Sequence, residues 1–252
     1  MHDENLYERV NASPRETVHC DPSTPRPAGL VLTSGPPLTK EKTIWIVRHG
    51  LSTWNAEGRI QGDTDASALT ERGREQAARC RDALAAIPFD SCFTSPLARA
   101  REFAEIVWEG RAAPLVHVDD LREAELGLLQ GLLNRDAEAL YPELYRLWRS
   151  RPQDLEIGGA RPVEAVFERA LRAWQTVLEA PGSCHLVVAH KSLFRALLCT
   201  AVGLGPGGFR SLDCANGGVS VVAVNRRGEP MVTGLNLTAH LTQEGVRYDP
   251  ER

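Results

Sequence analysis

Thr43-Ile44-Trp45-Ile46-Val47 is a β-branched and aromatic run that ends directly at Arg48-His49-Gly50. A short apolar run bounded by a turn residue is typical of a buried strand. Gly50 permits a tight turn and a close approach of a ligand to the backbone. Arginine grips an oxyanion and a neutral imidazole can attack phosphorus, so this strand end suits phosphate chemistry. The alternative interpretation is purely structural: the histidine only caps the strand through a hydrogen bond.

Apolar runs recur along the chain and predict further strands at Phe89–Thr94, Pro114–Val118, His185–Ala189, Val219–Val224 and Met231–Leu235. Helical patterns lie between them, over 70–86, 97–108, 135–149, 162–178 and 192–202. This alternation predicts an α/β fold, a three-layer αβα sandwich with a mostly parallel central sheet and helices on both faces. His190 directly follows one strand, as His49 follows the first. Because sites in such sheets lie at the carboxyl ends of strands, we expect one site to hold both histidines.

The chain divides into a tail and one domain. Residues 1–42 are rich in Pro, Ser and Thr and lack apolar periodicity, which predicts a flexible N-terminal tail. We expect the catalytic domain over residues 43–240, with a helical lid at about 126–165. Residues 241–252 form the expected C-terminal tail.

Charge and composition exclude several classes of function. Lys plus Arg number 29 against 33 Asp plus Glu, which argues against a general nucleic-acid binder but not against a small anionic ligand. No apolar run approaches the roughly 18–20 residues of a membrane helix, and the N-terminus lacks a signal peptide's apolar region. The six separated cysteines include no CxxC pair, which favours reduced thiols in a reducing intracellular compartment.

Four further motifs follow Arg48-His49-Gly50 along the chain. They are Ser52-Thr53-Trp54-Asn55 with Ile60-Gln61-Gly62, then Thr94-Ser95-Pro96-Leu97-Ala98-Arg99, Leu121-Arg122-Glu123 and Val187-Val188-Ala189-His190. In this order and spacing the sequence resembles the histidine phosphatase superfamily, in its phosphoglycerate-mutase-like branch, over roughly residues 43–240. Stretches such as 209–212 and 218–221 also look like those of plant and cyanobacterial 2-carboxy-D-arabinitol-1-phosphatase-like proteins.

The resemblance implies a phosphomonoesterase that works through a phosphohistidine. His49 would be the nucleophile, and Glu123 would protonate the leaving alkoxide and then activate water, with Glu125 as the competing acid. An alkoxide leaves poorly unless it is protonated, so a carboxylic acid is needed. The residues implied around the phosphate are Arg48, Arg99 and a protonated His190. These charges can do what a metal does elsewhere, so we expect neither metal nor cofactor.

The implied substrate contacts are Ser52, Asn55, Gln61, Gly62 and Lys191. Lys191 departs from the family pattern, which usually places Gly or Asn after the second histidine. Two interpretations stay open for it. It is either an outward-pointing cation in a salt bridge, or a positive charge near the pocket that favours a substrate with a second anionic group.

The expected partner is a small anionic phosphorylated metabolite, a sugar-acid phosphate such as 2-carboxy-D-arabinitol 1-phosphate. The compact lid favours hydrolysis over a phosphoglycerate mutase, which must keep water out. A phosphoserine or broad-specificity phosphatase and a non-catalytic phosphate-binding module also stay open. We expect no nucleic acid, no membrane, and a monomer or homodimer. The expected compartment is the chloroplast stroma if the source is photosynthetic, otherwise the cytoplasm.

One motif is a decoy. Residues 203–208 fit GxGxxG, the fingerprint of a dinucleotide-binding loop. That loop requires a strand before it and a helix opened by it. Here a helical pattern comes first and Pro206 lies inside, so we interpret the stretch as a helix C-terminus and a turn.

Overall fold

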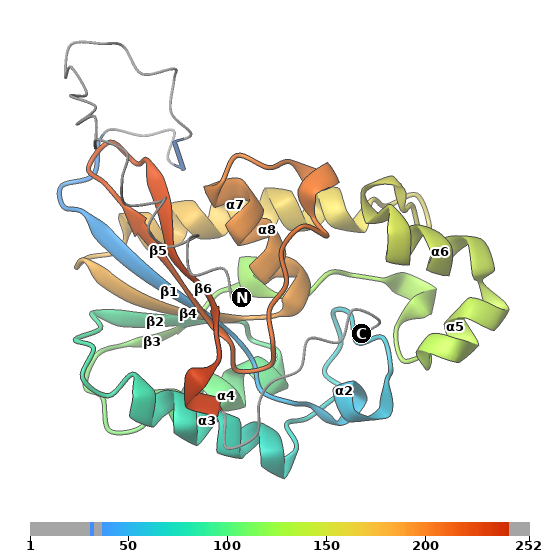
Figure 1. The fold of residues 1–252 in the computed structure, drawn as a ribbon, viewed down its shortest axis with the longest axis horizontal. Helices are drawn as coiled ribbons and strands as arrows, with labels where there is room; N and C mark the ends of the chain where they lie inside the picture. Colours follow the sequence, from blue (N-terminus) through green and yellow to red (C-terminus); the bar gives the residue numbers. More distant parts are fainter. Residues whose placement is uncertain (1–30, 33–36, 242–252) are drawn as a thin grey trace, which may run out of the picture.

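A six-stranded sheet forms the centre of the computed structural model, which describes residues 31–32 and 37–241 (Figure 1). Its strand order is β3-β2-β4-β1-β5-β6. Strands β1 to β4 pair in parallel, whereas β5 runs antiparallel to β1 and β6 antiparallel to β5. The strand bounds are β1 (Lys42–Arg48), β2 (Ser91–Thr94), β3 (Leu115–His117), β4 (Cys184–Ala189), β5 (Val219–Val224) and β6 (Pro230–Leu237). The prediction of a mostly parallel sheet is confirmed.

Strand β1 is buried on both faces, which is why its sequence is almost continuously apolar. Successive side chains of a strand point to opposite faces. Ile44 and Ile46 therefore belong to one core, and Val47 with Trp45 to the other. Helices α7 and α8 cover the first face and helices α3 and α4 the second (Figure 1). The result is the expected three-layer sandwich.

The helices are α2 (Thr53–Glu57), α3 (Glu71–Ala83), α4 (Ala98–Trp108), α5 (Asn134–Leu140), α6 (Pro142–Ser150), α7 (Pro162–Glu179) and α8 (Lys191–Ala201). The prediction of a single helix over 135–149 is wrong. The first helix ends before Tyr141, and a second helix begins at Pro142. Proline has no N–H to continue a helix but suits its first turn. Helix α2 was not predicted, because five residues are too short to show a periodicity.

The segment between β3 and α7, which contains the expected lid, holds no strand of the sheet and carries α5 and α6. These two helices lie beyond the sheet, on the same side of the view as α2 (Figure 1). The segment is tied to the loop after α2, because Ile60 N–H donates to Leu132 O over 2.9 Å and Gly131 N–H to Ile60 O over 2.8 Å. Backbone hydrogen bonds therefore join the loop that carries Ile60-Gln61-Gly62 to the segment that carries α5 and α6.

The GxGxxG decoy follows α8 and forms a short 3-10 turn at Pro206–Gly208, which confirms its interpretation as a helix end and turn. Within the described part of the chain, no helix combines the length and apolar character needed to cross a bilayer. The predicted N-terminal tail lies outside the described residues except for 31–32 and 37–42, and the C-terminal tail except for 241. Leu32 is buried, with its N–H donating to Gly228 O over 3.0 Å.

Candidate active site

The two histidines of the motifs meet at the carboxyl edge of the sheet. Strands β1 and β4 pair in parallel with Arg48 opposite Ala189, so the next residue of each strand, His49 and His190, enters the same region. Their ring centroids are 5.1 Å apart. The expectation that the two histidines lie together is confirmed.

His49 is almost completely buried, and its ring state follows from one hydrogen bond. Nδ1 lies 2.8 Å from the carbonyl oxygen of Gly50. A carbonyl can only accept, so Nδ1 carries the proton and Nε2 of the neutral ring keeps its lone pair. Burial, followed by the charges of Arg99 and Arg48, holds the pKa of His49 well below its usual value. The ring is therefore neutral at pH 7 and presents a nucleophilic nitrogen.

His190 is fully buried beside it, with Nε2 2.8 Å from Ser95 Oγ. Burial, followed by the charge of Arg99, holds the pKa of His190 well below its usual value. The expectation of a protonated His190 therefore does not hold for the structure as it stands, because burial and the nearby cations both disfavour a charged ring. A phosphate dianion at this place would oppose the effect of the cations.

Arg48 and Arg99 bind backbone carbonyls through their terminal nitrogens. Arg48 Nη1 donates to Cys214 O over 2.9 Å, and Arg99 donates to Thr64 O over 2.6 Å and to Gly62 O over 2.9 Å. Burial lowers the pKa of Arg99 to about 10, so the group stays charged. These bonds hold both guanidiniums, and the Nε of each has no hydrogen-bond partner among the described residues.

Three buried polar atoms of this group have no hydrogen-bond partner among the residues that the structure describes: Arg48 Nε, Arg99 Nε and His190 Nδ1. Buried donors are nearly always paired in folded proteins, because an unmade bond costs about 1–3 kcal/mol. Two of the three belong to arginines whose charges act on both histidines, and the third belongs to His190 itself. This arrangement is suited to an anion with several acceptor oxygens.

Glu123 is buried at the beginning of α8. Its carboxylate accepts from Ala124 N–H over 2.7 Å and, with both oxygens, from Ser192 N–H over 3.2 Å. Glu125 is exposed and accepts from Gly127 N–H instead. The structure therefore brings Glu123, and not Glu125, to the histidine-bearing edge.

Arg169 of α7 belongs to the site although the sequence reasoning did not find it. It donates to Arg122 O over 2.6 Å and to Glu123 O over 2.8 Å, and so holds the backbone that carries Glu123. Burial is the main reason that its pKa is lowered. No local pattern distinguishes it from Arg172, the other arginine of α7.

Ser52, Asn55 and Gln61 form one network rather than separate contacts. Ser52 caps α2, and its Oγ lies 2.9 Å from Asn55 Oδ1 and 3.0 Å from Gln61 Oε1. Asn216, which the sequence reasoning also missed, donates to the carbonyls of His49 and Gly50, both over 3.0 Å, and reaches Asn55 Oδ1 over 3.2 Å. This network holds the His49 loop from two sides.

Gly62 and Lys191 are not part of this side-chain network. Gly62 has φ +61° and takes part through its carbonyl, which accepts from Arg99. Lys191 is the first residue of α8, and its Nζ lies 2.9 Å from Asp213 Oδ1. Asp213 was not singled out from the sequence.

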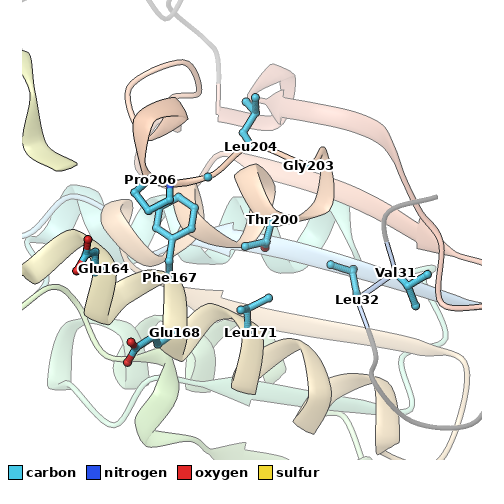
Figure 2. Close-up of a pocket in the computed structure, with 11 residues that line it drawn as sticks. Val31, Leu32, Glu164, Phe167, Glu168, Leu171, Thr200, Gly203, Leu204 and Pro206 are labelled. Atoms are coloured by element: carbon cyan, nitrogen blue, oxygen red, sulfur yellow. The ribbon is translucent and has the colours of Figure 1, made fainter. Parts of the chain in front are cut away.

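Two features bear on other kinds of site. Within the described residues there is no cluster of three or more histidine, cysteine, aspartate or glutamate side chains that could hold a metal ion. An apolar cavity of about 440 Å³ lies over α7 and the end of α8, lined by Phe167, Leu171, Leu204 and Pro206 among others (Figure 2). None of the candidate site residues described above lines it, so it is separate from the histidine pair.

The chain is similar in sequence to one protein family and to several known proteins. The family model described as "Histidine phosphatase superfamily (branch 1)" matches residues 44–238. The 2-carboxy-D-arabinitol-1-phosphatase of Triticum aestivum is 46% identical over 187 residues, which is 74% of this chain but only 38% of the wheat protein. Phosphoserine phosphatase 1 of Hydrogenobacter thermophilus is 30% identical over 197 residues, 78% of this chain and 92% of that protein.

A solved structure agrees with the sequence matches. The YhfR protein of Bacillus stearothermophilus superposes with a TM-score of 0.76 at 28% identity, covering 80% of this chain and 100% of that one. The family model spans all six strands of the sheet but the first residues of β1, and every motif residue discussed above. The chain therefore belongs to the histidine phosphatase superfamily.

Proposed function

We propose that this chain is a phosphoric monoester hydrolase that needs no cofactor and works through a phosphohistidine at His49. The observation that supports it best is the neutral His49 ring beside His190 and the unpartnered Nε donors of Arg48 and Arg99. The wheat and Hydrogenobacter relatives are both named as phosphatases, which agrees with the proposal.

In the first step the Nε2 lone pair of His49 attacks phosphorus, and the ester P–O bond breaks. The departing oxygen keeps the electron pair and takes a proton from Glu123. In the second step water attacks the phosphohistidine, Glu123 accepts a proton from the water, and the P–N bond breaks with its electron pair returning to Nε2. Phosphate leaves, and Glu123 again holds the proton that the first step needs.

The arginines stabilise the transferring group. Its three equatorial oxygens carry the charge of the transition state, and positioned donors in a water-poor site stabilise that charge strongly. Arg48 Nε and Arg99 Nε are buried donors on immobilised guanidiniums. They therefore need little reorganisation when the phosphate arrives.

For the substrate we propose a sugar-acid phosphate such as 2-carboxy-D-arabinitol 1-phosphate, supported by the name of the wheat relative. Phosphoserine is the second candidate, supported by the Hydrogenobacter relative, of which this chain covers nearly the whole length. Mutase activity, the oligomeric state and the chloroplast or cytoplasmic location stay predictions of the sequence.

The test replaces the nucleophile. We expect His49→Ala to lower kcat by about 10³-fold or more and to abolish the acid-labile phosphoenzyme that labelled substrate forms with the wild type. His117→Ala is the matched control, because His117 is exposed on β3, and it should keep full activity. The panel contains 2-carboxy-D-arabinitol 1-phosphate, phosphoserine, phosphoglycerates and p-nitrophenyl phosphate. Full turnover in His49→Ala would refute the mechanism.

A further inference from the structure

Three cations hold three consecutive residues at the edge of the site. Arg195 donates from Nε to Leu212 O and from Nη2 to Asp213 Oδ1, both over 2.8 Å. Lys191 Nζ lies 2.9 Å from the same Asp213 oxygen. Arg48 donates to the next carbonyl, that of Cys214, over 2.9 Å. Asp213 and Cys214 are adjacent, so Lys191 and Arg48 bind the same short segment, and Arg48 is close enough to lower the pKa of Lys191.

The charges in this group do not balance. Lys191, Arg195 and Arg48 carry three positive charges and Asp213 one negative charge. Arg195 binds Asp213 in a nearly buried position, with 7% of its side chain exposed, so Asp213 already has a counter-ion. Arg195 alone neutralises the Asp213 carboxylate, so the charge of Lys191 is in excess.

Lys191 is also the more accessible of the two partners of Asp213, with 24% of its side chain exposed. Its ammonium has three donors, and Asp213 takes one. The pKa of Lys191 is lowered mainly by burial and then by Arg48 and Arg195, which places it within the field of the phosphate-binding arginine. The ammonium therefore offers further donors at a positive edge of the site.

We propose that Lys191 binds a carboxylate of the substrate whose phosphate lies against Arg48, and that Asp213 holds the ammonium in place for it. The inference rests on the phosphatase function proposed above and narrows its substrates to phosphomonoesters that carry a carboxylate a few bonds from the ester oxygen. The salt bridge to Asp213 and the contact to substrate are then two parts of one arrangement, since one ammonium serves both.

The experiment compares matched substrates. 2-Carboxy-D-arabinitol 1-phosphate is paired with D-arabinitol 1-phosphate, and phosphoserine with phosphoethanolamine. For Lys191→Met we expect kcat/KM to fall about 10- to 100-fold on the carboxylated member, mostly through KM, because a charged hydrogen bond is lost. The uncarboxylated member should lose less than about threefold by the same reasoning. Lys191→Arg keeps the charge and should keep most of the preference.

The control is Lys40→Met, because Lys40 is exposed just before β1, at the opposite end of that strand from His49. It should leave both members of each pair unchanged. An equal loss on both members in Lys191→Met, or no loss on either, would overturn the inference.

Binding separates this inference from the proposed function. In a His49→Ala background, calorimetry gives the affinity for the same pairs without turnover. Lys191→Met should there weaken binding of the carboxylated ester by the same factor and abolish the preference. If the preference for the carboxylate survives Lys191→Met, the inference is wrong even where the enzyme hydrolyses phosphate esters through His49. A wild type without phosphatase activity, but with a Lys191-dependent preference in binding, would instead contradict the proposed function alone.

Discussion

Glu123 is held by its backbone as well as by its carboxylate. Arg169 donates to the carbonyls of Arg122 and Glu123, while Ser192 N–H binds the carboxylate itself. A general acid works only when its proton lies within hydrogen-bond reach of the departing oxygen. Arg169 is thus a positioning residue that acts through the segment carrying Glu123.

We expect Arg169→Met to lower kcat about 10- to 100-fold on an alkyl phosphate, because small misplacements of a catalytic group cost that much. The loss should be smaller on p-nitrophenyl phosphate, whose leaving group needs no proton. Steady-state kinetics with both substrates measures this. Arg172→Met is the control from the same helix, because Arg172 forms an exposed pair with Asp120 that contributes little. Equal losses on the two substrates would assign Arg169 a purely structural role.

The loop after strand β1 approaches helix α3 so closely that only glycine fits at the two contact positions, Gly50 and Gly73. A Cβ on Gly50 would lie 2.5 Å from Gly73 O, and a Cβ on Gly73 would lie 2.2 Å from Leu51 O. Helix α3 begins at this point, with Thr70 Oγ1 accepting from Gly73 N–H over 3.1 Å. The chain can therefore turn from His49 into the Ser52 network only while both positions lack a side chain.

Gly50→Ala should lower the free energy of unfolding by about 1–3 kcal/mol, because the added methyl group forces two backbone segments apart. It should also lower kcat, since the displaced residue follows His49. Urea unfolding and steady-state kinetics measure the two effects. Gly205→Ala is the matched control: nothing lies within 4 Å of the added Cβ and its φ is −82°, so both properties should stay near wild type. A Gly50→Ala protein as stable as this control would contradict the packing argument.

Predictability from sequence also varied between elements. Apolar runs predicted all six strands. Strands β1, β4 and β5 are mostly buried and are therefore nearly continuously apolar. Strands β3 and β6 are half-buried or exposed, and were found because they too carry apolar residues. Helices α5 and α6 were joined into one, because their apolar spacing continues across Tyr141 and Pro142. Helix α2 was missed, because it depends on the Ser52–Asn55 capping box rather than on an apolar face.

Three buried histidines make the stability of the whole molecule depend on pH. Burial and neighbouring cations hold the pKa values of His49 and His190 well below their usual range, and burial with Lys42 lowers the pKa of His185 to about 4. His185 lies at the other end of β4 and bonds Ser91 Oγ through Nδ1 over 2.7 Å. All three are therefore neutral in the folded chain near pH 7.

A histidine with a lowered folded pKa is protonated first in the unfolded chain, whose pKa is about 6.5. Acid then favours unfolding, so the stability is fully present above about pH 6.5 and is lost as the pH falls toward the folded pKa. Each histidine contributes a slope of up to about 1.4 kcal/mol per pH unit in this range. Asp90 and Asp213 also have lowered pKa values, but their contribution to stability is lost only nearer pH 4, where an aspartate of the unfolded chain titrates.

Urea unfolding at pH 7.5, 6.5 and 5.5 should therefore show a free energy of unfolding that decreases steeply below pH 6.5. His185→Gln should remove about a quarter to a third of that slope, because the pKa of His240 is lowered as well, whatever the effect of the substitution on stability at pH 7.5. His117→Gln, at an exposed position, should leave the slope unchanged. A stability that is flat between pH 7.5 and 5.5 would show that the three rings are not held neutral.

The sequence by itself determined the sheet, the order of its motifs and the meeting of His49 with His190, because strand patterns are local and parallel strands end at one edge. Only the tertiary structure decided which distant groups serve those residues. Asn216 lies 167 positions from His49, and Arg169 lies 46 positions from Glu123. Neither follows a strand or a glycine turn, so no local pattern marks them. Their roles arise from packing. Helix α7 and the loop before β5 lie against segments whose buried backbone carbonyls require hydrogen-bond donors, and these two side chains supply them.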